Sequence, residues 1–153
     1  MTPESSDQSV VRGNTTYRRT GAAWALAAVE ISVAIQAIAG GLALIGDQWS
    51  MDPLWLRHTP FVSWTGPGVL LIVVIALPHL MAAAAIVVRP VPVRLGMVGG
   101  LLAGVSLIIW IIMQIALLQV FFFLQPVVAV LGALEIGLAA WWRRALRSED
   151  GAF

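Results

Sequence analysis

Residues 67–88 (PGVLLIVVIALPHLMAAAAIVV) decide the fold class, because none of these 22 positions carries a charged side chain. An apolar run of about 20 residues is the length that a helix needs to cross the hydrocarbon core of a bilayer. Three more apolar runs of this kind occur in the chain, so we predict an all-α, integral membrane four-helix bundle. The predicted helices cover about 22–46, 67–88, 96–120 and 124–142.

The composition favours the same class of protein. Of the 153 residues, 59% are hydrophobic and only 11% are charged, and the mean hydropathy is +0.90. This leaves too little polar surface for a soluble enzyme domain or a disordered regulator. The net charge of +1 provides no basic surface for nucleic acid, so the expected surroundings are the lipid bilayer. The absence of Cys excludes disulfides, thiolate catalysis and cysteine-ligated metals.

The positions of the nine arginines predict the orientation. Only Arg57 lies in the connection between the first and second helices. Basic residues concentrate on the cytoplasmic side of a membrane, which predicts an N-in, C-in protein of a bacterial inner membrane. Residues 1–20 and 143–153 are then cytoplasmic tails that flank a transmembrane domain at 21–142. The arginines on the predicted cytoplasmic side are Arg12, Arg18, Arg19, Arg89, Arg94, Arg143, Arg144 and Arg147.

Tryptophans near the predicted cytoplasmic surface are expected to anchor the bundle. Trp24, Trp141 and Trp142 lie close to that surface, where an indole ring can contact lipid while its N–H hydrogen-bonds. We expect all three to serve as anchors.

The first external connection, residues 47–66, is also rich in tryptophan. Asp52 followed by Pro53 is a favourable start for a short helix over about 53–58, lying in the outer interface. Two interpretations stay open for this connection: a simple interfacial segment, or a lid over an outward-facing ligand pocket.

Three ionisable residues occur at a similar depth in the predicted helices. At a rise of about 1.5 Å per residue, Glu30, His79 and Glu135 lie roughly 10–14 Å from the inner interface. Small residues flank each of them at helical spacing, so we expect all three side chains to point into the bundle. Gln36 and Gln114 lie further out and complete the candidate polar site.

Such a site has a structural and a functional interpretation. Burial and a nearby second carboxylate both favour a neutral carboxyl group, so Glu30 and Glu135 are expected to share at least one proton, bridged by His79. The cluster then either joins helices or couples protons to a cationic ligand. Two Glu and one His form a sensible ligand set for Zn²⁺ or iron, but no i, i+3 or i, i+4 pairing supports a metal. We therefore expect no metal and no cofactor.

The third predicted helix carries a glycine stripe, Gly96, Gly100 and Gly104, at four-residue spacing. This spacing permits close helix packing, either within the chain or against a protein partner or second copy. In the second helix, Pro78 immediately precedes His79 and should kink that helix, which is a common way to shape a cavity at membrane depth.

Four segments carry a resemblance to known proteins: AGGLALIGD (39–47), TPFVSWTGPGVLLIVV (59–74), WIIMQIALLQ (110–119) and LQPVVAVLGALEIGLA (124–139). In these the chain resembles a group of small bacterial four-helix membrane proteins without assigned activity, and in general plan it is similar to DoxX-like proteins. The latter resemblance suggests an association with membrane redox complexes.

The sequence favours a non-enzymatic accessory or interaction protein, because it contains no Ser/His/Asp arrangement, Walker motif or GxGxxG motif and leaves no room for a folded extramembrane domain. The alternative is a small proton-coupled transporter or ligand-binding protein that uses Glu30, His79 and Glu135.

Overall fold

A computed structural model describes residues 19–150, with side chains as far as Arg147, and confirms the predicted fold class. Within this range four helices are long and apolar enough to cross a membrane, and there is no strand. The chain is therefore a multi-pass membrane protein. Most of the predicted N-terminal tail, including Arg12 and Arg18, and the last three residues lie outside the described range. The elements are α1 (Gly21–Ile45), η1 (Pro53–Leu56), α2 (Thr65–Leu70), η2 (Leu71–Ala76), α3 (Leu77–Val87), α4 (Val93–Leu118) and α5 (Leu124–Asp150).

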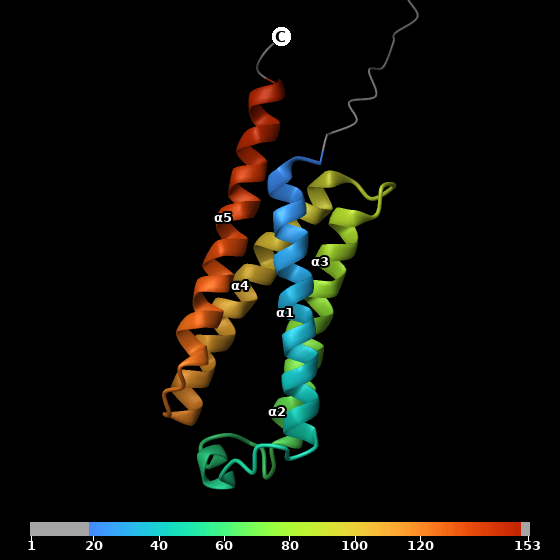
Figure 1. Cartoon of the computed structure of the whole chain (residues 1–153). Helices are drawn as coiled ribbons and strands as arrows, with labels where there is room; N and C mark the ends of the chain where they lie inside the picture. Colours follow the sequence, from blue (N-terminus) through green and yellow to red (C-terminus); the bar gives the residue numbers. More distant parts are fainter. Residues whose placement is uncertain (1–18, 151–153) are drawn as a thin grey trace, which may run out of the picture.

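The four spans run side by side (Figure 1), and each packs against two neighbours, so that they surround a common interior. α1 packs against α5 on one side and against the second span, made of α2, η2 and α3, on the other. α4 packs between α3 and α5 and makes few contacts with α1. A side chain that points inward from α1, α3 or α5 therefore enters a space closed by the other helices.

The second span is not one regular α-helix. Thr65–Val87 crosses as a single unit, but Leu71–Ala76 has π-helical geometry, in which the Leu77 N–H donates to the Ile72 carbonyl, five residues back. Pro78 follows two residues later and has no N–H to donate, so the regular α-helical hydrogen bonding is interrupted here. The π-helical segment ends two residues before Pro78 and three before His79, and the kink expected from Pro78 stays a prediction.

α5 extends to Asp150, beyond the predicted end at 142. The reason is packing: Trp142 and Leu146, one turn apart, continue the buried face of α5 that includes Glu135 and Ala139. They pack with Leu26 and other residues at the start of α1. The predicted role of Trp142 as an interface anchor is wrong, because its side chain is completely buried, whereas Trp24 and Trp141 are exposed.

The connection between α1 and α2 is folded rather than extended. The Asp52 carboxylate accepts a hydrogen bond from the Leu54 N–H at 2.8 Å and starts the short 3₁₀ helix η1. The Trp64 indole N–H donates to the Met51 carbonyl at 3.0 Å, and the Trp55 ring stacks edge-on against both Trp64 and Phe122. The connection therefore packs against the turn that joins α4 to α5.

Candidate functional site

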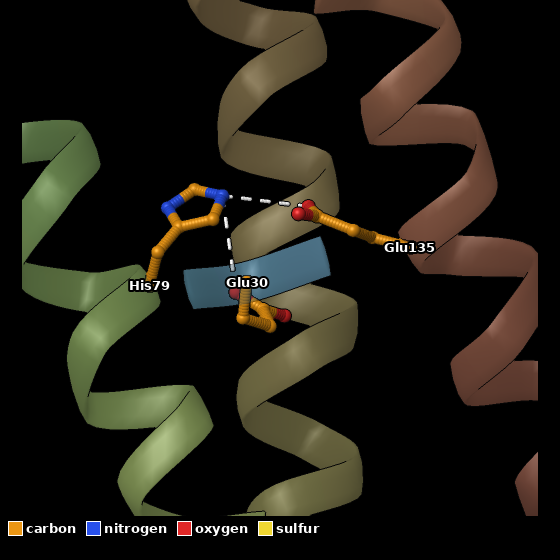
Figure 2. Close-up of side chains that lie close together, drawn as sticks. All are labelled: Glu30, His79 and Glu135. Atoms are coloured by element: carbon orange, nitrogen blue, oxygen red, sulfur yellow. Dashed lines mark ion pairs between the residues drawn. The ribbon is translucent and has the colours of Figure 1, made fainter. Parts of the chain in front are cut away.

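Glu30, His79 and Glu135 meet in the interior of the bundle (Figure 2). They come from α1, α3 and α5, and each is completely buried. His79 Nε2 lies 3.4 Å from Glu135 Oε2 and 3.9 Å from Glu30 Oε2. One ligand atom from each residue can be chosen so that all three lie within 4.8 Å of one another. We call these three residues the acidic cluster.

The imidazole of His79 is oriented by the backbone of its own helix. Its Nδ1 lies 2.6 Å from the Ile75 carbonyl oxygen, one turn back, next to the π-helical turn. A carbonyl oxygen can only accept a hydrogen bond, so Nδ1 is the nitrogen that carries the hydrogen. In the neutral ring Nε2 is then an acceptor, and this atom faces both carboxyl groups.

The electrostatic character of the acidic cluster follows from this orientation. All four carboxyl oxygens and His79 Nε2 are buried, and none has a hydrogen-bond partner in the described part of the chain. Two carboxylates and an imidazole lone pair are all acceptors. Buried acceptors that face one another are unfavourable unless protons or a cation lie between them. The arrangement is therefore chemically able to hold positive charge.

α4 closes the fourth side of the acidic cluster with glycines instead of side chains. A Cβ on Gly100 would lie 2.6 Å from a methyl of Leu26 and 3.2 Å from Glu30 Oε1. A Cβ on Gly104 would lie 3.0 Å from the Cβ of Glu135. Gly96, at the end of the stripe, packs in the same way against Ile86. The glycine stripe thus contacts three different helices of its own chain, and two of its members make room for the two glutamates.

The two glutamines predicted as part of the polar site do not join the cluster. Gln36 is exposed and donates from Nε2 to the Ser32 carbonyl at 3.2 Å. Gln114 is half-buried, and it lies ten residues beyond Gly104, or about 15 Å along α4. The structure therefore separates a compact group of three residues from two amides nearer the other end of the bundle.

Two further polar residues have structural roles that were not predicted from the sequence. Gln125 is buried, and its amide donates to the Val120 carbonyl while its Oε1 accepts from the Phe122 N–H, both at 3.2 Å. Arg19 donates to the Ile86 carbonyl and, at 2.6 Å, to the Val88 carbonyl. Gln125 stabilises the turn between α4 and α5, and Arg19 ties the start of α1 to the end of α3. Pro126, which follows Gln125 directly, was the only sequence signal for the turn that Gln125 stabilises.

A separate cavity of about 260 Å³ lies between the first turns of α4 and the C-terminal part of α5. Arg94, Arg143 and Arg147 line it together with apolar side chains. No acidic residue whose side chain the structure describes contributes to its lining, so this cavity and the acidic cluster are chemically distinct.

No known protein family, curated protein or solved structure matches the chain in the three comparisons that were made. The resemblance to small bacterial four-helix proteins and to DoxX-like proteins therefore stays a prediction, and the site is interpreted from its own geometry.

Proposed function

We propose that this protein binds protons and a small cationic ligand inside the membrane, at the acidic cluster. The observation that carries the proposal is the meeting of two buried carboxyl groups and His79 Nε2, from three helices, where none of these atoms has a hydrogen-bond partner in the described part of the chain. Ionisable side chains at membrane depth are costly and usually serve ion or proton chemistry. Of the two functions expected from the sequence, this supports the proton-coupled binding or transport protein.

A purely structural role fits the cluster less well. Polar residues that join helices in membranes pair a donor with an acceptor, as Ser, Asn or Gln can do. Here the only donor that His79 has when neutral is used within its own helix, on the Ile75 carbonyl. The helix-joining interaction then requires an added proton or cation, and binding that charge is the activity that we propose.

The structure does not leave the glycine stripe free as a contact surface for a partner, which the accessory role could have used. Gly96, Gly100 and Gly104 are buried against helices of the same chain, so the stripe offers no free surface in this structure. A partner or second copy would have to use another face of α4.

We further propose that the end of the bundle at which α1 and α4 begin and α3 and α5 end faces the cytoplasm of a bacterial cell (Figure 1). Arg19 comes just before α1, Arg94 lies at the start of α4 and Arg143 lies in the last part of α5, whereas Arg57 lies in the connection between α1 and α2. The positive-inside rule supports this orientation in an inner membrane.

Infrared difference spectroscopy tests proton binding directly. Full-length protein in lipid nanodiscs is compared at acid and alkaline pH, and the carboxyl C=O signal is recorded. We expect a signal that responds to pH and is lost in the double variant Glu30→Gln, Glu135→Gln. The matched control is Asp47→Asn, because Asp47 is an exposed carboxyl in the connection after α1, with a positive φ of 50° that Asn tolerates.

The two outcomes separate clearly. A pH-dependent signal that disappears only in the double glutamine variant supports the proposal. A signal that is unchanged in that variant, or is absent from the wild type, overturns it.

A further inference from the structure

We infer that the cationic ligand of the acidic cluster is a first-row divalent metal ion, held by Glu30, His79 and Glu135 and exchanged for protons. This inference rests on the proposed function and identifies its ligand. The sequence argued against a metal, because no two of the three ligands are paired at i, i+3 or i, i+4 spacing. The fold brings them together from three different helices.

The distances within the cluster suit a metal better than direct hydrogen bonds. Hydrogen bonds between nitrogen and oxygen have donor to acceptor distances of about 2.7–3.2 Å. The Nε2 to oxygen distances are 3.4 Å and 3.9 Å. In a tetrahedral site with metal to ligand bonds of about 2.0 Å, neighbouring ligand atoms are about 3.3 Å apart. The observed spacing thus requires only small side-chain movements to meet that geometry.

The surroundings of His79 are also those of a metal ligand. A metal-binding imidazole almost always donates its second N–H to a carboxylate or a backbone carbonyl, which fixes the ring and its tautomer. His79 does this through Nδ1 and the Ile75 carbonyl. The free Nε2 faces the two carboxyl groups, as a ligand atom must.

Charge balance favours a divalent ion over a monovalent one. Two carboxylates carry two negative charges, and a neutral imidazole adds none. A dication therefore makes the cluster neutral, as two bound protons do. Binding one metal ion from the two-proton state releases two protons and leaves the buried charge at zero, which avoids the cost of a net charge in a low dielectric.

The chemistry of the three ligand side chains limits which metal ions fit the site. One imidazole nitrogen and carboxylate oxygens suit Zn²⁺, Mn²⁺ or Fe²⁺, whereas soft monovalent copper prefers sulfur ligands, and the chain has no Cys. Mg²⁺ dehydrates reluctantly and prefers six oxygen ligands, so it is expected to compete poorly here. Three protein ligands leave a coordination position for water, which is typical of sites whose metal or ligand exchanges.

Equilibrium dialysis with Zn²⁺ tests the inference on full-length protein in nanodiscs, with excess Mg²⁺ present. We expect one Zn²⁺ per chain and up to two protons released for each ion bound. His79→Gln and Glu135→Gln should each weaken binding at least about tenfold. The control is His58→Gln, since His58 is the only other histidine and lies in the connection after α1. X-ray absorption should show nitrogen and oxygen ligands at about 2.0–2.2 Å.

A second readout covers variants that fold poorly. Zn²⁺ should raise the thermal midpoint of the wild type and of His58→Gln, but not that of His79→Gln, because only the folded cluster binds the ion. Zinc bound through His58, or no bound zinc, overturns the inference. If the infrared signal of Glu30 and Glu135 persists in that case, proton binding stands and only the metal is excluded. If that signal is also absent, both proposals fail.

Discussion

Gly104 and Gly132 bring the backbones of α4 and α5 into direct contact. A Cβ on Gly104 would lie 2.7 Å from the Gly132 carbonyl oxygen, and a Cβ on Gly132 would lie 2.9 Å from that of Gly104. The neighbouring atoms are backbone, which cannot rotate away. This close approach carries Glu135, one turn beyond Gly132, into the interior of the bundle, where it meets His79.

Gly104→Ala should therefore destabilise the bundle. The added methyl group pushes α4 away from α5, and overpacking of this kind costs about 1–3 kcal/mol. Denaturant unfolding in detergent measures the change. Gly137→Ala is the matched control, because a Cβ there meets nothing within 4 Å and improves helix propensity by up to about 1 kcal/mol. Equal stability of the two alanine variants would contradict the close contact.

Trp142→Ala should lower the unfolding free energy by about 3–5 kcal/mol, because it leaves a cavity between the C-terminal part of α5 and the start of α1. Trp141→Ala removes the same side chain from the neighbouring position, where it is 64% exposed. Its effect should be small. Thermal melts followed by circular dichroism compare the two variants. A lower midpoint for Trp141→Ala than for Trp142→Ala would contradict the burial of Trp142 against α1.

Arg19→Ala should loosen the contact between α1 and α3. The guanidinium group donates to two carbonyls at the C-terminal end of α3, where a positive charge is also favoured by the helix dipole. We expect a loss of about 1 kcal/mol and faster amide hydrogen exchange at Ile86 and Val88. Arg89→Ala, an exposed arginine just after α3, is the control and should leave that exchange unchanged.

Glu30→Gln should not destabilise the fold. An amide of the same shape replaces one acceptor with a donor at the point where three acceptors meet, and a new hydrogen bond to His79 or Glu135 contributes about 1 kcal/mol. The thermal midpoint should stay the same or rise, while proton and metal binding fall. If the midpoint drops sharply, the acidic form of Glu30 is itself the element that holds the helices together.

Much of the fold could be predicted from hydropathy and turn residues. Four apolar runs of spanning length predicted the four helices, and Asp52-Pro53 predicted the short helix η1. The end of α5 was missed because the charged residues from Arg143 onward lower the mean hydropathy there, although Trp142 and Leu146 are buried. Hydropathy averages over a whole turn, whereas burial depends on one face of the helix.

The candidate site was predicted in part. Equal depth and small neighbours placed Glu30, His79 and Glu135 on one level, and the structure brings them together. Gln36 and Gln114, which lie further out, were also included in the predicted site, although Gln36 is exposed and Gln114 is only half-buried. Contact between three helices depends on the glycines of α4, and the partners of Gly100 and Gly104 could not be identified from spacing.

His79 presents an Nε2 without a hydrogen to the two glutamates. Nitrogen NMR of ¹⁵N-histidine-labelled His58→Gln protein in lipid measures this directly, because that variant contains His79 as its only histidine. We predict a protonated Nδ1 and an Nε2 resonance that moves when Glu135 is changed to Gln. A neutral ring with its hydrogen on Nε2, and a spectrum unaffected by Glu135→Gln, would contradict the account.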